Sequence, residues 1–187
     1  MSKTSKEALL HAARLSAQAH GYSGLNIRSL ASEVGIKAAS IYHHFPSKAE
    51  LGAAVARRYW EETAADLDAL RESEPDAISR LRRYPEIFRR SLERDNRICM
   101  ASFMAAEYDD LPDQVKEEVK IFAEVNIAWL AAQLEEAGIA SDEERNSRAQ
   151  AIYAAIAGAQ LMARGRSDIA LFDSLVKSYA QAGLLPA

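Results

Sequence analysis

The sequence predicts an all-α protein, and three observations carry that prediction. Ala, Leu, Glu, Arg and Gln dominate its 187 residues, whereas the apolar–polar alternation of strands is scarce. Apolar side chains recur at the i, i+3, i+4 and i+7 spacing of one helix face. Gly and Pro number only 8 and 5, too few for a disordered or fibrous chain. This length suits one domain or two small ones, with a core that needs neither a disulfide nor a metal.

Caps and helix-breaking residues delimit the first helices. Asn26 and Ser47 are favourable N-cap residues, and Ser47 can form a capping box with Glu50. Gly35 permits a tight turn after the second helix. Pro46 ends the third helix because the residue before a proline avoids the α region. We therefore expect helices over residues 6–19, 27–34, 37–44 and 47–70.

The rest of the chain is also predicted to be helical, over residues 76–94, 97–108, 113–137, 142–164 and 168–182. Pro85 either kinks or breaks the first of these helices. The charge of the chain changes sign near residues 53–60, inside a long helix and without a flexible linker. We therefore expect two domains, a head over residues 1–52 and a body over residues 53–187.

The charge distribution suggests a polyanionic partner for the head. Residues 1–60 contain eight basic and three acidic side chains, a net charge of +5, while the remainder carries −9. A basic region on an acidic protein is typical of nucleic-acid binding, although the overall charge is only −4. A chance fluctuation over so short a segment is the alternative.

Residues 27–45 have the spacing of a helix-turn-helix. The small residue Ala31 suits a close approach of two helices, Gly35 follows four positions later, and Ile41 packs back from the next helix. The remaining core positions are Leu30, Val34 and Ile36. Short or polar residues face outward from the second helix of the motif. An ordinary helical hairpin is the alternative, but the basic flank and the caps favour DNA binding.

Four short motifs resemble a known family. They are His20-Gly21-Tyr22, Ile27-Arg28-Ser29-Leu30-Ala31, Val34-Gly35-Ile36 and, above all, Ser40-Ile41-Tyr42-His43-His44-Phe45-Pro46-Ser47-Lys48. Through them, residues 6–60 resemble the DNA-binding domain of TetR/AcrR-type transcriptional repressors. The resemblance implies an all-α homodimer whose three-helix heads enter successive major grooves of a palindromic DNA operator. It also implies a long helix that joins each head to a helical body, which binds a small-molecule effector and dimerises.

The resemblance places the DNA contacts on the head. Tyr42 and His44 would contact DNA from the recognition helix, and Lys48 would contact phosphate beside a helix N-terminus. Arg28 would meet the DNA backbone or a base edge. His43 and His44 point about 100° apart, so they cannot readily chelate one ion, and no metal site is predicted. The predicted DNA-binding residues are Arg28, Lys37, Ala38, Ser40, Tyr42, His43, His44 and Lys48.

The body resembles the family more weakly, through residues 99–107 and Trp129. We expect a largely apolar or aromatic effector with a few polar anchors, and no cofactor. The predicted effector-binding residues are Cys99, Met100, Phe103, Met104, Tyr108, Phe122, Asn126, Trp129 and Tyr153. The last two helices suit a dimer interface because Ala155 and Gly158 allow close packing. The predicted interface residues are Ile152, Ile156, Ala159, Phe172, Leu175 and Tyr179, with internal core as the alternative.

Cys99 is the only cysteine, so the chain can form neither an internal disulfide nor a Cys-based zinc cluster. It is either a small buried hydrophobe or a thiol that senses electrophiles or oxidants. Arg94 and Arg97 could lower its pKa if they lie close in space. An electrophile-sensing or oxidant-sensing repressor is therefore one alternative function.

Other classes of protein are less well supported. The chain lacks a phosphate-binding loop and the H-E-x-x-H and G-x-S-x-G motifs, and its S-x-x-K match at residues 174–177 is isolated, so we predict no enzyme. A helical interaction module without specific DNA recognition is the remaining alternative. No run approaches 18 apolar residues, and the N-terminus lacks the apolar stretch of a secretory signal. We therefore expect a cytoplasmic protein.

Overall fold

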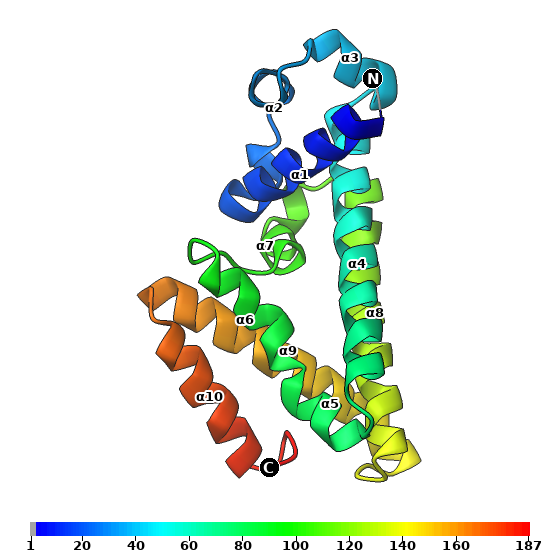
Figure 1. Ribbon diagram of the computed structural model, residues 1–187, viewed down its shortest axis with the longest axis vertical. Helices are drawn as coiled ribbons and strands as arrows, with labels where there is room; N and C mark the ends of the chain where they lie inside the picture. Colours follow the sequence, from blue (N-terminus) through cyan, green and yellow to red (C-terminus); the bar gives the residue numbers. More distant parts are fainter. Residues whose placement is uncertain (1–2) are drawn as a thin grey trace. The chain divides into compact units, whose positions relative to one another are not determined.

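The computed structural model describes residues 3–187 and contains only helices in that part of the chain, which confirms the all-α prediction (Figure 1). The α-helices are α1 (Lys3–His20), α2 (Ile27–Val34), α3 (Ala38–His44), α4 (Lys48–Ser73), α5 (Ala77–Arg83), α6 (Pro85–Glu93), α7 (Met100–Ala106), α8 (Asp113–Glu136), α9 (Asp142–Arg166) and α10 (Ile169–Gln181). Short 3-10 helices are η1 (Tyr22–Gly24) and η2 (Tyr108–Asp110). None of the described helices combines the length and the apolar character that a membrane span requires.

The chain forms two compact units. The first unit comprises the chain up to Glu61 together with Met100–Phe122, and the second comprises Glu62–Cys99 and Ala123–Ala187. The division therefore cuts two of the long helices, α4 and α8. The predicted boundary after residue 52 remains a proposal, because a compact unit is not by itself a domain that folds alone.

In the first unit, α1, α2 and α3 enclose a small apolar core. Leu30, Ala31 and Ile41 are buried, together with Leu9 and Ala13 of α1. The other predicted core residues, Val34 and Ile36, lie on either side of the turn and are only half-buried. The core therefore depends on one face of each short helix, which leaves the other faces of α2 and α3 to solvent.

The predicted caps and the predicted turn are present. Asn26 Oδ1 accepts hydrogen bonds of 3.0 Å from the backbone N–H groups of Arg28 and Ser29. Gly35 has φ 71°, a left-handed conformation that Gly adopts at no steric cost. Ser47 Oγ accepts a 3.1 Å bond from the Glu50 N–H. These local interactions set the start of α2, the turn and the start of α4.

Within the first unit, one carboxylate joins η1 to the end of α7 and another joins α4 to α8. Glu107 accepts a 2.6 Å hydrogen bond from the Tyr22 N–H, and it packs against Gly21 so closely that a Cβ there would lie 2.1 Å from its Oε2. Glu118 is buried and accepts bonds from Arg57 Nε (2.9 Å) and Trp60 Nε1 (2.8 Å). Nothing in the local pattern of the sequence signals either contact.

In the second unit, Pro85 resolves the question that the sequence left open. Helix α5 ends at Arg83 and α6 begins at Pro85, so the helix breaks there, although Tyr84 keeps α-helical backbone angles. Helix α6 packs on α9 and α10, and α9 packs on α10. The side chains of Tyr84 and Phe172 are among the largest that this unit buries completely.

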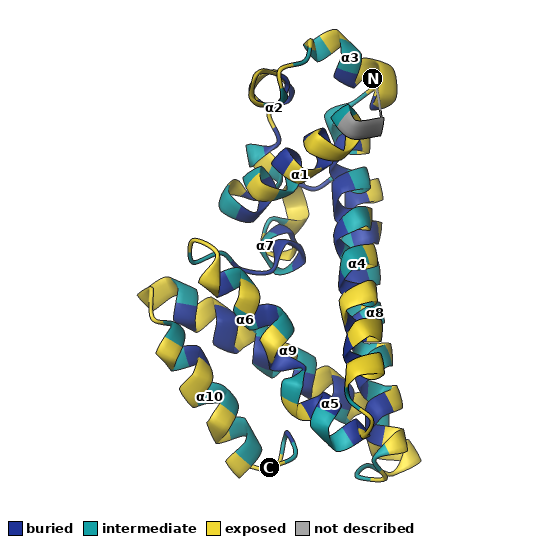
Figure 2. Ribbon diagram, viewed as in Figure 1, coloured by how far each residue is buried: buried dark blue, intermediate teal, exposed yellow. Residues whose placement is uncertain are grey.

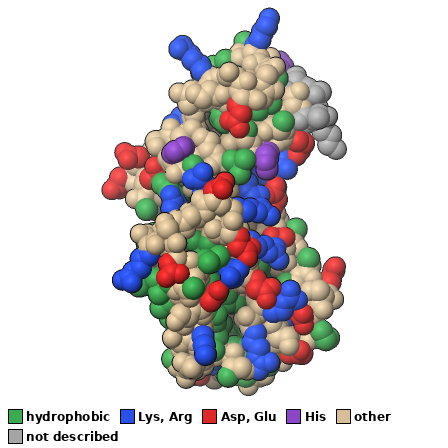
Figure 3. All heavy atoms as spheres, turned by 60° about the vertical axis from the view of Figure 1, so that its left-hand side comes forward, with side chains coloured by type: hydrophobic (Ala, Val, Ile, Leu, Met, Phe, Trp, Pro, Cys, Tyr) green, Lys and Arg blue, Asp and Glu red, His purple; other side chains and the backbone are tan. Residues whose placement is uncertain are grey.

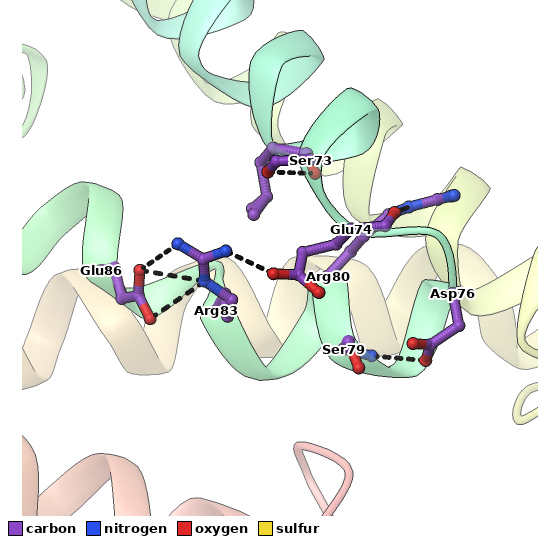
Figure 4. A network of polar contacts seen from close by, with 8 residues as sticks. Ser73, Glu74, Asp76, Ser79, Arg80, Arg83 and Glu86 are labelled. Atoms are coloured by element: carbon purple, nitrogen blue, oxygen red, sulfur yellow. Dashed lines mark hydrogen bonds and ion pairs between the residues drawn. The ribbon is translucent and has the colours of Figure 1, made fainter.

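Charged residues form a network of ion pairs and hydrogen bonds where α4 ends and α5 begins (Figure 4). Arg83 forms ion pairs with Glu74 and Glu86, and Asp76 caps α5 by accepting a 2.8 Å bond from the Ser79 N–H. The hydrogen bonds from Ser79 lower the pKa of Asp76, because they stabilise its ionised form. Arg80 is buried, and its guanidinium donates to Gln133, Glu136 and the carbonyls of residues 74 and 75. The network therefore satisfies its one buried cation with several acceptors.

Candidate nucleic-acid interface

Helix α3 presents a polar face to solvent (Figure 2). Ile41 is completely buried and anchors the helix, whereas the next residue, Tyr42, is 50% exposed. The other predicted residues of this segment are likewise accessible: Lys37, His43 and His44 are exposed, and Ala38 and Ser40 are half-buried. This separation of faces leaves side chains that can enter a groove of DNA without disturbing the core.

A hollow of about 340 Å³ lies beside this face in the first unit. Arg28 from α2, Tyr42 from α3 and Lys48 from α4 line it together, along with Ser23, Leu25, Asn26 and Ile27. The Lys48 ammonium lies 4.5 Å from the centre of the Tyr22 ring, and it donates a 3.4 Å bond to the Ser23 carbonyl. Two cations and a phenol at one hollow match the charge and the hydrogen-bonding needs of a phosphate.

The histidines at the end of α3 are held close to other positive groups. The ring centres of His43 and His44 are 5.1 Å apart, in an edge-to-face arrangement. Desolvation, together with the charges of His43 and Lys6, lowers the pKa of His44. His44 is therefore neutral at pH 7 and can both donate and accept a hydrogen bond.

The charged surface agrees with this arrangement. Lys and Arg side chains project from the head at the upper end of Figure 3. Within the residues that the structure describes, no group of three or more His, Cys, Asp and Glu side chains is placed to hold a metal ion. The features of the head are thus a helix-turn-helix, an exposed polar helix face and paired cations.

Residues 4–55 match the sequence profile of the family "Bacterial regulatory proteins, tetR family". Residues 4–55 therefore form a DNA-binding domain of the TetR family. A TetR transcriptional regulator from Legionella pneumophila is 29% identical, with a TM-score of 0.89 over 97% of this chain and 98% of that one. A TetR-family regulator from Agrobacterium tumefaciens is 26% identical, with a TM-score of 0.88 over 96% and 97%. The search of curated proteins found no match.

The family match of residues 4–55 and the two structural matches over nearly the whole chain confirm the predicted all-α fold, with an N-terminal helix-turn-helix domain and a helical body. The fold extends to a putative regulator from Saccharomonospora viridis in complex with choline, which is 21% identical, with a TM-score of 0.80 over the whole of both chains. The roles of individual residues in this protein remain predictions, because the fold alone does not assign them.

The predicted effector residues divide between the two units. In the first unit, Met100, Met104 and Phe122 are buried and Phe103 is half-buried. Tyr108 is 58% exposed, and the Lys116 ammonium lies 4.7 Å from the centre of the Tyr108 ring. Tyr108 therefore lies on the surface of the first unit. In the second unit the structure brings together Cys99, Asn126, Trp129 and Tyr153.

These second-unit residues surround Tyr84, which the sequence analysis did not select. Tyr84 is completely buried, donates a 2.9 Å hydrogen bond to Asn126 Oδ1 and stacks on Trp129 with ring centres 5.7 Å apart. Burial raises the pKa of Tyr84 well above its ordinary value, so its hydroxyl stays protonated. Phe88 and Tyr153 continue the aromatic layer, with ring centres 6.2 Å apart. The position of Tyr84 directly before a proline was its only local signal.

Cys99 is 2% exposed, and its backbone N–H donates a 2.8 Å hydrogen bond to Gln160 Oε1. Gln160 is also buried and donates a 2.6 Å bond to the Phe88 carbonyl. Arg94 is exposed and Arg97 is half-buried. A buried small side chain is thus the better description of Cys99 in this state, and the sensor remains a hypothesis.

The predicted dimer residues lie inward. Ile152, Ile156 and Ala159 of α9 are completely buried in one chain, and Phe172 of α10 is nearly so. They therefore form internal core, which was the alternative, whereas the two other predicted residues, Leu175 and Tyr179, are half-buried. The surface of α9 instead exposes Gly158, Leu161 (60%) and Met162 (49%). A dimer interface on α9 and α10 remains a proposal.

Proposed function

We propose that this protein is a homodimeric TetR-family repressor that binds a palindromic operator and is released by a small organic effector. The observation that carries the proposal is the exposed polar face of α3 beside the hollow that Arg28, Tyr42 and Lys48 share. Repression, dimerisation and release by an effector are proposed from the similarity of the chain to TetR-family regulators.

The head can both hold and read DNA. Arg28 and Lys48 would bind the DNA backbone at the hollow that they share, which fixes the position of α3 without selecting a sequence. Tyr42, His43 and His44 would approach the base edges, and Ala38 can offer only a methyl contact. With so few hydrogen-bonding side chains on α3, the shape of the DNA would share in the selection.

A second copy of the chain supplies the second head. The exposed Leu161 and Met162, next to the small residue Gly158, favour a helix-to-helix contact through α9. The half-buried residues Leu175 and Tyr179 of α10 would complete it. Two heads related by a twofold axis require half-sites about one helical turn apart, roughly 34–36 Å, or somewhat more.

The effector would bind the second unit, where the aromatic layer around Tyr84 contains several neutral polar groups. The Saccharomonospora viridis regulator, in complex with choline, shows that a protein of this fold can hold a small organic molecule. Release from DNA requires that the effector bind the DNA-incompetent arrangement more tightly than the competent one. DNA and effector must then weaken each other by the same factor.

The test is a selection of fragments bound from genomic DNA at about physiological salt, which suppresses non-specific phosphate contacts. The wild-type protein is expected to enrich one palindrome. The Arg28→Ala/Lys48→Ala variant should lose that enrichment while it keeps its melting temperature. No enrichment by a folded, dimeric protein would instead favour a helical interaction module, and effector affinity that is equal with and without the operator would contradict the release mechanism.

A further inference from the structure

The two tryptophans of the chain differ in one respect. Trp60 donates its indole N–H to the Glu118 carboxylate at 2.8 Å. Trp129 Nε1 is buried, yet none of the residues that the structure describes accepts a hydrogen bond from it. A buried donor without an acceptor is costly, because it has given up its hydrogen bonds to water. Such a donor in a native protein indicates that a partner outside the chain completes it.

The surroundings of Trp129 describe that partner. Its indole ring is half-buried and stacks on Tyr84 at an interplanar angle of 20°. The neighbouring acceptor, Asn126 Oδ1, lies one helical turn away on α8 and already receives the Tyr84 hydroxyl proton. The Phe88 ring also contacts that of Tyr84, with ring centres 5.6 Å apart. The unpartnered Trp129 donor therefore lies beside a cluster of aromatic rings.

We propose that Trp129 Nε1 is the anchoring donor of the effector site, and that the effector is a small, neutral, planar molecule with a carbonyl-type acceptor. The effect of this ligand on DNA binding rests on the proposed function, whereas its binding beside Trp129 does not. The contacts recorded around Tyr84 come from neutral groups, so an ionic ligand would lose its hydration there without gaining a counter-charge. A planar ligand can instead lie against the aromatic rings while its oxygen accepts from the indole.

The experiment compares two probes of similar shape, acetophenone and ethylbenzene, on the full chain labelled with ¹⁵N at its tryptophan indoles. Trp60→Phe leaves Trp129 as the only indole and assigns its signal. Acetophenone is expected to move the Trp129 N–H proton signal downfield, as a new hydrogen bond does, whereas ethylbenzene should not. Trp129→Phe should weaken acetophenone about tenfold and leave ethylbenzene unchanged, since it removes one buried hydrogen bond and keeps an aromatic ring.

Three results would overturn the inference. They are a Trp129 signal that neither probe moves, equal weakening of both probes by Trp129→Phe, and an indole proton that exchanges with solvent as fast as a free indole, which would show water as its partner. If Trp129→Phe fails to fold, the Trp60→Phe variant still tests the inference, because acetophenone and ethylbenzene should shift its Trp129 N–H signal differently. The proposed function is tested separately: a probe that binds Trp129 without affecting DNA would support the site and contradict release.

Discussion

Polar side chains reach solvent on α3 of the head, whereas in the second unit Tyr84, Asn126 and Gln160 are buried among apolar neighbours. The exposed residues make few contacts inside the chain, so they can change without cost to the fold. The buried ones exchange hydrogen bonds with one another or with the backbone, so each holds several elements in place. DNA binding and the stability of the second unit should therefore respond to different substitutions.

The largest expected effect is on stability, in the second unit. Gln160→Leu keeps roughly the volume of the side chain but removes the two buried hydrogen bonds that Gln160 makes with the Cys99 N–H and the Phe88 carbonyl, so it should lower the free energy of unfolding by about 3 kcal/mol. Gln150→Leu makes the same change at an exposed position of α9 and should have little effect. Urea denaturation of both variants measures the difference. Equal stabilities would mean that Gln160 only fills space.

The next effect concerns DNA affinity, in the head. Arg28→Ala should weaken operator binding about tenfold and reduce the salt dependence by about one released counterion, because one phosphate contact is lost. Its melting temperature should not change, since Arg28 is exposed. Arg90→Ala removes the same charge from the second unit and is the control. Binding isotherms at several salt concentrations would contradict the assignment if both variants lost the same affinity.

A smaller effect is expected from pH. The pKa of His44 is lowered in the free protein, so the residue is neutral there, and DNA phosphates would raise it. Protonation then accompanies binding, and operator affinity should increase by up to about tenfold per pH unit as pH falls from about 7.5 to about 5.5. His44→Asn should reduce the dependence of operator affinity on pH, while His43→Asn measures how much His43 contributes to that dependence. A slope of opposite sign would exclude His44 from the DNA contact.

The smallest effect is expected at the surface of the second unit. Arg90 pairs with Asp66 at 3.3 Å, and both side chains are about half exposed. Arg90→Ala should therefore change the free energy of unfolding by no more than about 0.5 kcal/mol. Thermal denaturation at low and high salt measures this. A loss of several kcal/mol in the free energy of unfolding would show that exposed ion pairs stabilise the second unit as strongly as buried polar groups do.

Much of the head could be predicted from the sequence, because its determinants are local. Asn26, Gly35 and Ser47 act within a few residues of themselves, through caps and a left-handed turn, and the periodicity around Ile41 sets which face of α3 is buried. The accessible positions of α3 followed from the same periodicity. Such short-range interactions leave a pattern that can be read without knowing how the chain folds.

The partners of the buried polar groups were decided only by the tertiary structure. Glu107 meets the Tyr22 N–H across 85 positions of sequence, and Gln160 meets the Cys99 N–H across 61. In the same way, the apolar stripe of α9 fits a dimer interface as well as a core, and packing on α6 and α10 placed it inside the chain. Periodicity shows that a helix has an apolar face; which surface covers that face depends on contacts that the local sequence does not encode.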